Sequence, residues 1–197
     1  MLSIKQKLLK VAYPFLVNLA KVLGINAATV KGPKVSAPPE SLYQLTIPLI
    51  NGKELPLSEY KGKKILFVNT ASNCGYTGQY EELKKLEQQV GNKLKIVAFP
   101  ANDFKEQEKG SDEEIQQFCS VNFGIDFPLA KKSVVIKSED QNIVYQWLTN
   151  KNKNGWNDQQ PKWNFSKYLV NENGALTHYF DASVSPLSDD VLKAVNE

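Results

Sequence analysis

Residues 65–77 read Ile-Leu-Phe-Val-Asn-Thr-Ala-Ser-Asn-Cys-Gly-Tyr-Thr, and this stretch decides the fold of the chain. Its apolar start is typical of a buried strand, and the small and polar residues that follow indicate a loop with Cys74 at its tip. Residues 78–89 then have apolar positions at helical spacing. A cysteine between a strand end and a helix start faces unpaired N–H groups and the helix dipole, which favour the nucleophilic thiolate. The alternative is that Cys74 is a small buried hydrophobic residue, as free cysteines often are.

The composition limits the classes of function. A chain of 197 residues with 42% hydrophobic and 23% charged residues is long enough for one globular domain with a full core. The formal net charge of +3 does not favour nucleic-acid binding. Two cysteines exclude a disulfide-stapled scaffold, and with a single histidine, His178, they do not favour a zinc site. His178 lies in an alternating run that is typical of a structural strand residue.

The segments around the Cys74 loop predict α/β layering, with a mixed sheet and helices on both sides. The strand at 65–68, the helix at 78–89 and a strand at 94–99 form a βαβ unit, which requires parallel strands. The other elements that we expect are a hairpin around Asn51-Gly52 (42–57), a helix with a Ser111/Glu114 capping box (112–122), a short strand (133–137), a helix (142–150), a loop (151–162), a second hairpin (163–180) and a final helix capped by Ser188 (188–195).

Residues 1–31 stand apart because apolar residues alternate with lysines. This pattern suits an amphipathic helix interrupted near Pro14. Three interpretations compete: a helix docked on the domain, a weak membrane-surface contact, and a signal peptide with a faint cleavage pattern at Ala27-Ala28. We favour a docked or surface-associated helix. The Pro- and Gly-containing residues 31–40 indicate a linker, so we assign 1–40 to an N-terminal segment and 41–197 to the main domain.

Three motifs resemble those of the glutathione peroxidases, and within them the cysteine-containing, thioredoxin-dependent branch. They are residues 68–77 around Cys74, residues 99–108 (Phe-Pro-Ala-Asn-Asp-Phe-Lys-Glu-Gln-Glu) and residues 162–169 (Lys-Trp-Asn-Phe-Ser-Lys-Tyr-Leu). The motifs occur in the family's order and spacing, and the resemblance covers about residues 40–197. It implies a thioredoxin-like fold, with the hairpin at its start and the N-terminal amphipathic helix as an addition.

The resemblance also implies a catalytic tetrad. Cys74 would be the peroxidatic nucleophile, and Gln107, Trp163 and Asn164 would be its hydrogen-bonding partners. Three positions depart from the family's usual Phe-Pro-Cys-Asn-Gln-Phe-Gly motif, because Ala101, Asp103 and Lys105 replace its cysteine, glutamine and glycine. The matched glutamine is kept, so the departures concern the shape and charge of the loop.

These residue types suit peroxide reduction, in which a thiolate attacks one peroxide oxygen and the other oxygen leaves protonated. A free cysteine has a pKa of about 8.5, so donors aimed at the sulfur are needed to favour the thiolate. Amide and indole N–H groups are neutral donors that stabilise the negative charge without cancelling it. Each partner also has a structural alternative: Trp163 as a core aromatic residue, Asn164 as a turn residue and Gln107 as a solvated loop residue.

Attack leaves Cys74 as a sulfenic acid, which condenses with a nearby thiol. Cys119 falls where the thioredoxin-dependent branch has its resolving cysteine. A disulfide needs Cα atoms within about 7 Å, so we expect the helix at 112–122 to loosen before Cys119 reaches Cys74. A thioredoxin-like protein would then reduce the disulfide by exchange. Cysteine stands where some relatives have selenocysteine, so we expect no selenium and no other cofactor.

Three alternative functions stay open at this point. A glutathione-dependent peroxidase is one, although it can dispense with a resolving cysteine such as Cys119. A peroxide sensor that relays its disulfide to a partner is another, and an inactive thioredoxin-fold binding module is the third. We expect a cytoplasmic monomer, with a membrane-associated or periplasmic location as the alternatives. The expected substrates are hydrogen peroxide and organic or lipid hydroperoxides, the last if residues 1–31 touch a membrane.

Overall fold

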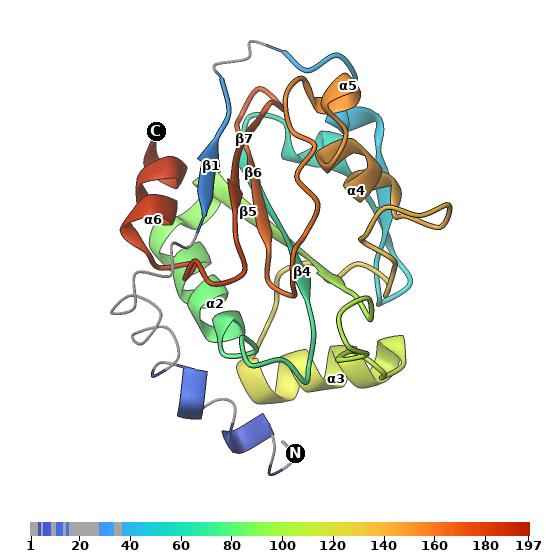
Figure 1. Ribbon diagram of the computed structural model, residues 1–197, viewed down its shortest axis with the longest axis vertical. Coiled ribbons are helices and arrows are strands. Elements are labelled where there is room, and N and C mark those ends of the chain that lie inside the picture. Colours follow the sequence, from blue (N-terminus) through green and yellow to red (C-terminus); the bar gives the residue numbers. More distant parts are fainter. Residues whose placement is uncertain (1–3, 5, 9–10, 14, 16–27, 34–36) are drawn as a thin grey trace.

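The computed structural model describes residues 4, 6–8, 11–13, 15, 28–33 and 37–197. A five-stranded mixed sheet in the order β1-β7-β6-β4-β5 forms the centre, with helices on both faces (Figure 1). The strands are β1 (Thr29–Lys31), β2 (Thr46–Pro48), β3 (Glu54–Pro56), β4 (Lys64–Thr70), β5 (Leu94–Pro100), β6 (Lys167–Val170) and β7 (Leu176–Phe180). The helices are α2 (Gln79–Val90), α3 (Asp112–Phe123), α4 (Ile143–Leu148), α5 (Lys151–Asn154) and α6 (Asp189–Asn196).

The βαβ unit predicted around Cys74 is confirmed. Strands β4 and β5 are parallel and pair from Lys64 opposite Leu94 to Thr70 opposite Pro100. Both strands are almost wholly buried, which explains why their sequences are continuous apolar runs rather than alternating ones. Strand β6 pairs antiparallel with the other edge of β4. The strand that leads to Cys74 therefore lies inside the sheet and is held from both sides.

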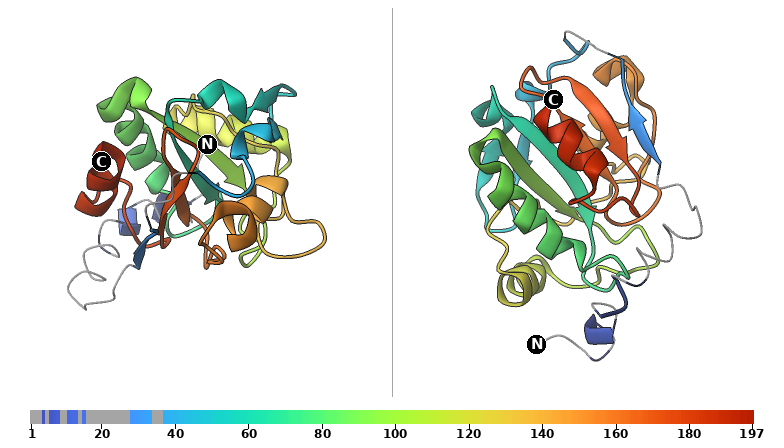
Figure 2. Two further views of the ribbon diagram at one scale, coloured as in Figure 1. Left: turned by 90° about the horizontal axis from the view of Figure 1, so that it is seen from above. Right: turned by 90° about the vertical axis from the view of Figure 1, so that its left-hand side faces the viewer.

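Alternate residues of the sheet face two separate cores. Leu66, Val68 and Ile96 point into a cluster that also contains apolar residues of α2, α3 and α6. Phe67 and Val97 point to the opposite face, against α4 and the β2–β3 hairpin. Figure 2 shows α2 and α6 side by side over one face of the sheet. This two-sided burial is what the α/β prediction requires.

The N-terminal hairpin is confirmed as a two-stranded sheet of its own, but it is shorter than the predicted range 42–57. Leu42–Gln44 and Leu57–Tyr60 form 3-10 helical turns at its two ends. Strands β2 and β3 are antiparallel, with Gly52 at a φ of 80° in the turn between them. That φ is a conformation that glycine adopts without strain. Strand β1 is an element that the sequence pattern does not reveal. It pairs antiparallel with β7 at the edge of the main sheet, with Val30 opposite Tyr179.

Three segments differ from the sequence prediction. Residues 133–137 form no strand, because only an isolated bridge joins Val134 to Gln141. The expected loop at 151–162 begins with the short helix α5. The second hairpin starts at Lys167 rather than at Trp163, since residues 163–166 form a turn before the strand. The other predicted helices are confirmed, including the capping box of α3 and the Ser188 cap of α6.

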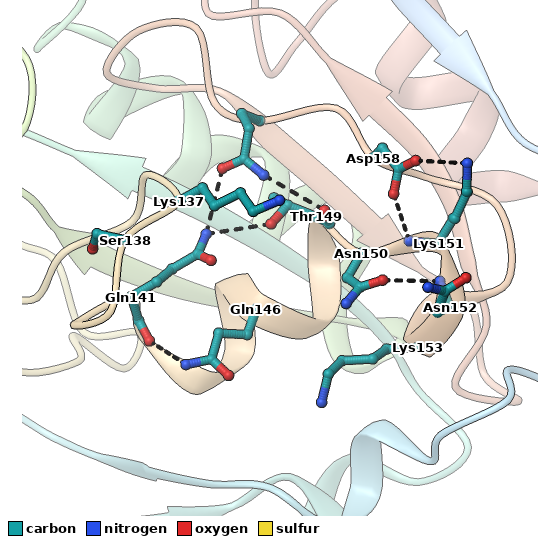
Figure 3. Close-up of a pocket in the computed structure, with 11 residues that line it drawn as sticks. Lys137, Ser138, Gln141, Gln146, Thr149, Asn150, Lys151, Asn152, Lys153 and Asp158 are labelled. Carbon is teal, nitrogen blue, oxygen red and sulfur yellow. Dashed lines mark hydrogen bonds and ion pairs between the residues drawn. The ribbon is translucent and has the colours of Figure 1, made fainter.

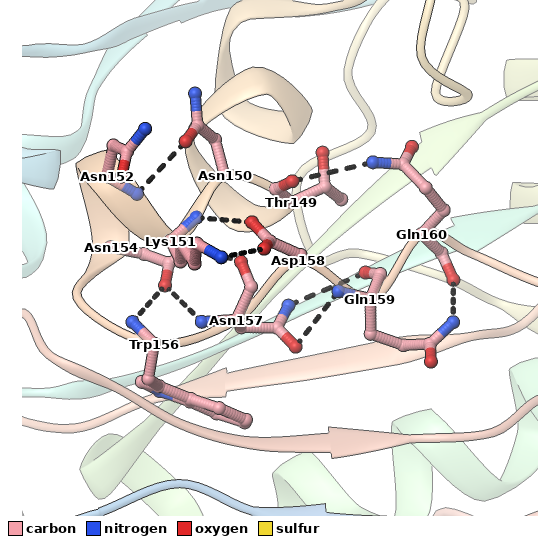
Figure 4. Close-up of polar contacts among 10 residues, drawn as sticks. All are labelled: Thr149, Asn150, Lys151, Asn152, Asn154, Trp156, Asn157, Asp158, Gln159 and Gln160. Atoms are coloured by element: carbon pink, nitrogen blue, oxygen red, sulfur yellow. Dashed lines mark hydrogen bonds and ion pairs between the residues drawn. The ribbon is translucent and has the colours of Figure 1, made fainter.

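Buried side-chain amides shape the segment that returns from α5 to β6 (Figure 4). Asn154 Nδ2 donates to the carbonyls of Trp147, Leu148 and Asn157, and Asn157 Nδ2 donates to Leu148. Tyr168 then ties the segment to the sheet, because its hydroxyl donates to the carbonyl of Gln159 at 2.8 Å. These bonds replace the backbone ladder that a loop lacks and fix the approach to Trp163.

The described residues of the N-terminal segment include helical turns at 6–8 and 11–13, which lie at the end of the molecule near the start of α2 (Figures 1 and 2). Pro14, where we expected the helix to be interrupted, lies outside the described residues, as do residues 16–27, which include Ala27 of the expected cleavage pattern. No helix among the described residues is long and apolar enough to cross a bilayer.

Candidate active site

The Cys74 loop connects β4 to α2 and is closed by local hydrogen bonds. Thr77 Oγ1 accepts from the Cys74 N–H at 3.1 Å and donates to the Ala71 carbonyl at 2.9 Å. The Tyr76 N–H points back at the sulfur, with 3.4 Å between N and Sγ. Cys74 is completely buried. The loop thus directs backbone N–H groups, those of Gly75 and Tyr76, at the Cys74 sulfur. This is what the position of the cysteine before a helix predicts.

A turn formed by residues 163–166 brings Trp163 and Asn164, two of the predicted partners of Cys74, to the Cys74 loop. The Asn69 side-chain amide donates to the Trp163 carbonyl at 3.0 Å. Phe165 has a φ of 70°, a conformation that is uncommon for residues with a side chain. The fully buried Lys167 side chain stabilises this backbone, because its Nζ donates to the carbonyls of Phe165 and Val184, both at 2.7 Å. The turn therefore presents Trp163 and Asn164 in one fixed arrangement.

Gln107 joins the site through Asn164. The Asn164 Nδ2 donates to Gln107 Oε1 at 2.9 Å, and the Gln107 carbonyl accepts from the Asn73 N–H at 3.1 Å. Gln107 therefore bridges the turn to the residue before Cys74. The buried Asn164 Oδ1 has no hydrogen-bond partner among the described residues. An acceptor of this kind, beside a thiol, suits the O–H of a peroxide.

The departures from the usual second motif affect the backbone conformation and the contacts of the loop around Lys105. Lys105 and Glu106 both have positive φ, at 52° and 51°, where the usual motif has glycine at the first position. In return the Lys105 Nζ lies over the Trp163 ring, 5.6 Å from its centroid. The Phe104 ring packs against the same indole with centroids 5.7 Å apart. The loop holds the indole from two sides at the cost of local backbone strain.

Two opposing influences act on the pKa of Cys74. Burial raises the pKa of the thiol, because a charge is poorly solvated inside the protein. Hydrogen bonding from the Tyr76 N–H, the Trp163 and Asn164 side chains and the Gly75 N–H lowers it. Burial is the larger influence, so the pKa is raised overall. Of the donors expected from the sequence, Trp163 and Asn164 are directed at the sulfur. Gln107 is not among the groups that bond to the sulfur and bonds to Asn164 instead.

Comparisons with known proteins decide the family. The sequence model named "Glutathione peroxidase" matches residues 42–149. The Bacillus subtilis glutathione peroxidase homolog BsaA is 35% identical over 162 residues, which cover 80% of this chain and 99% of that protein. The chain belongs to the glutathione peroxidase family. Saccharomyces cerevisiae glutathione peroxidase-like peroxiredoxin 2 is 38% identical and covers 76% of this chain, with 93% of its own length matched.

Solved structures agree with this assignment. The crystal structure of T. cruzi GPX1 has a TM-score of 0.60 and 26% identity, and covers 80% of this chain and 97% of its own. A DsbF homologue from Corynebacterium diphtheriae, with a TM-score of 0.62 and 14% identity, covers 85% and 91% and shows the fold alone. The predicted thioredoxin-like α/β fold is confirmed. This glutathione peroxidase family member is a thiol peroxidase, an oxidoreductase that reduces hydroperoxides.

The second cysteine of the peroxidase lies on α3. Cys119 is completely buried and belongs to the same cluster of buried side chains as Cys74. Burial raises the pKa of its thiol to about 12, and the interaction with Tyr80 acts in the opposite direction. Both cysteines are free thiols. The helix is capped at both ends, by the Ser111/Glu114 capping box and by Gly124 at a φ of 59°.

Glu108 is a further residue at the site, and its role there is not evident from the sequence pattern. This residue is 1% exposed, and its carboxylate accepts from the Ser72 hydroxyl at 3.1 Å. Its own N–H donates to Asn102 Oδ1 at 2.9 Å. Glu108 thus ties the loop before Cys74 to the chain after Gln107. A glutamate is normally solvated, so only its position next to Gln107 in the motif could have identified it.

We expect Glu108 to make the stability of the peroxidase depend on pH. Burial raises its pKa from 4.5 to about 7, so the folded protein keeps a proton that the unfolded chain has lost. The stabilisation is complete below pH 4.5 and is lost as the pH rises through about 7. Glu108→Gln keeps the acceptor for Ser72 but removes the titration. Its free energy of unfolding, from denaturant titrations, should therefore fall less with rising pH, by up to about 3 kcal/mol.

The comparison between wild type and variant isolates this carboxyl group because every other titrating group is common to both proteins. Lys167 is one of them, since burial lowers its pKa to about 7. The exposed Glu139 supplies a matched control, and Glu139→Gln should leave the pH dependence unchanged. Equal pH dependence in wild type and Glu108→Gln would show that the carboxyl is hydrated rather than buried.

Other polar features do not suit peroxide chemistry. A hollow of about 690 Å³ beside α4 and α5 is lined by amides and lysines, and two of its three lysines, Lys151 and Lys153, form ion pairs with acids (Figure 3). None of its lining residues is a thiol. His178 is buried in β7 and stacks on the Phe180 ring at 5.5 Å, as a structural residue would. Among the described residues no group of three or more His, Cys, Asp or Glu side chains could hold a metal ion.

Proposed function

We propose that this peroxidase works by a two-cysteine cycle. The Cys74 thiol attacks a hydroperoxide ROOH, giving the Cys74 sulfenic acid and the alcohol ROH. The Cys119 thiol then condenses with the sulfenic acid, so that a disulfide forms and water leaves. A reduced dithiol protein of the thioredoxin type restores both thiols and is itself oxidised to a disulfide.

One observation carries this proposal: Cys74 is surrounded by neutral donors and shares a buried cluster with the second thiol of the chain. Trp163 and Asn164 direct hydrogen bonds at the sulfur, and Gln107 fixes Asn164. Cys119 belongs to the same cluster but lies within a helix, so the disulfide requires α3 to open. This opening separates the oxidation step from the resolving step.

The test follows the two thiols and then the electron donor. We expect peptide-mapping mass spectrometry after one equivalent of hydrogen peroxide to find a Cys74–Cys119 disulfide. Steady-state turnover should then be at least about tenfold faster with thioredoxin, thioredoxin reductase and NADPH than with glutathione and glutathione reductase. Oxidised Cys74 beside a free Cys119 thiol would instead favour the glutathione-dependent alternative. A disulfide that forms rapidly but supports no turnover with either donor would favour the peroxide sensor.

Further expectations belong to the same proposal. The sulfur chemistry needs no metal, selenium or other cofactor, because the external thiol supplies the electrons. A monomer suffices, since one chain carries both cysteines and all four predicted tetrad residues. A cytoplasmic location fits a thioredoxin-type donor, and the similarity to bacterial relatives supports it. The proposed function also includes a contact of residues 1–31 with a membrane surface. This contact would bring lipid hydroperoxides within reach of Cys74.

A further inference from the structure

The described part of the N-terminal segment carries an apolar stripe on its outer side. Ile4, Leu8, Val11 and Phe15 are 80%, 65%, 70% and 78% exposed, and all four are helical. Their spacing of four, three and four residues places them on one face of an α-helix. They are four of the five most exposed large hydrophobic residues in the described part of the chain. A contiguous apolar stripe in water is costly unless something covers it.

The opposite face of the same helical turns is attached to the candidate active site. Gln6 Nε2 donates to the Ser72 carbonyl at 3.2 Å, two residues before Cys74. Tyr13 is buried, its hydroxyl donates to Glu82 at 2.9 Å, and its ring meets the Tyr76 ring edge-on at 6.2 Å. The stripe and the Cys74 loop therefore lie at the same end of the molecule (Figure 2).

The charges around the stripe identify its partner. Residues 4–15 contain three lysines, Lys5, Lys7 and Lys10, and no acidic residue, whereas all 21 acidic residues of the chain lie in residues 40–197. Lys7 is exposed between Ile4 and Leu8. An apolar stripe flanked by lysines is the combination that binds anionic bilayers, because the apolar side chains enter the interface while the lysines meet the lipid phosphates.

We propose that the Ile4–Phe15 stripe docks on an anionic lipid bilayer. The attachment of the same helical turns to Ser72, Tyr76 and Glu82, through Gln6 and Tyr13, then keeps the Cys74 loop at the end of the molecule that faces the membrane. This deepens the proposed function, on which it rests for its catalytic consequence, by assigning the face and the orientation of the contact. A second copy of the chain is a poor occupant, because four residues are far fewer than the roughly 20 a side that a stable interface uses.

The experiment is flotation of the full chain with vesicles, without peroxide. One set of vesicles is pure phosphatidylcholine, and the other contains phosphatidylcholine and phosphatidylglycerol. We expect wild type to float with the anionic vesicles and to bind the neutral ones at least about tenfold more weakly. A variant in which Ile4, Leu8, Val11 and Phe15 are all replaced by serine should lose about a hundredfold or more in binding to the anionic vesicles.

A matched control changes exposed apolar residues elsewhere. Ile136→Ser with Ile143→Ser should float as wild type does, because these residues are 38% and 48% exposed outside the stripe. Reduction of hydrogen peroxide in solution is measured on every variant and should stay within about twofold, since the stripe touches no reacting group. This readout separates the two ideas: loss of vesicle binding with intact activity supports the stripe, and inactivity of wild type refutes only the proposed function.

Three results would overturn the docking proposal. If wild type failed to float with the anionic vesicles, the chain would have no affinity for anionic bilayers. Equal flotation of wild type and the serine variant would place the contact elsewhere on the molecule. A dimer in wild type that becomes a monomer in the serine variant, measured by light scattering, would make the stripe an interface between two copies.

Discussion

Cys74→Ser is expected to abolish peroxide reduction. A serine hydroxyl has nearly the shape of the thiol but is far less nucleophilic at neutral pH, so the first step fails while the fold is kept. We expect the rate of hydrogen peroxide reduction to fall at least about a thousandfold, which corresponds to about 4 kcal/mol in the activation barrier. The measurement is single-turnover peroxide consumption by the reduced protein, because it does not depend on any electron donor.

A thermal unfolding curve serves as the control for this variant. Cys74 is fully buried in the cluster between the sheet and α2, so the melting temperature reports directly on whether serine fits there. If the folded serine variant kept activity within about tenfold of wild type, Cys74 would not be the nucleophile. Cys119 would then be the remaining thiol to test.

Cys119→Ser should separate the two halves of the cycle. Oxidation of Cys74 should proceed within about twofold of wild type, because Cys119 is not among the groups directed at the Cys74 sulfur. Steady-state turnover with thioredoxin should fall at least about a hundredfold, because the sulfenic acid has no thiol within the chain to condense with. A sulfenic-acid reagent such as dimedone should then label Cys74 in the variant, as detected by mass spectrometry.

Helix α3 supplies both a control and a way to test its opening. The exposed Ser120 is the neighbour of Cys119, and Ser120→Ala should behave as wild type in both assays. Ser111→Ala removes one half of the capping box, which typically costs about 1 kcal/mol of helix stability. If opening limits disulfide formation, this loss should make the disulfide form about fivefold faster. Full thioredoxin-driven turnover by Cys119→Ser would contradict the two-cysteine cycle outright.

The proposed cycle requires α3 to open, and the composition and the structure of this helix point in opposite directions. Ser120 and Asn122 in this helix are modest helix formers, which by themselves predict a segment of low stability. The structure adds caps at both ends and buries Ile115, Cys119 and Phe123 in the core. Caps and core contacts stabilise the closed helix, and in the proposed cycle they keep the Cys119 thiol buried before Cys74 is oxidised. Its raised pKa has the same physical cause.

Much of the fold could be predicted from local sequence. The continuous apolar runs of β4 and β5, the helical spacing of α2 and the capping box of α3 are patterns of neighbouring residues, and all were confirmed. Strand β1 could not be predicted in the same way, because its pairing with β7 joins residues about 150 positions apart. Residues 133–137 have the composition of a strand but find no neighbouring edge to pair with beyond one bridge.

Part of the candidate site could likewise be predicted from local sequence, and part of it could not. The sequence by itself determined the identity and order of the site residues, Cys74, Gln107, Trp163 and Asn164, because three local motifs carry them. Their roles remain predictions, and Cys74→Ser tests the first of them. Only the tertiary structure decided that Gln107 and Asn164 bond to each other, that Glu108 is buried beside Ser72, and that burial outweighs the donors around the sulfur. The reason is physical: burial and hydrogen-bond geometry depend on every segment packed around a group, most of them distant in the chain.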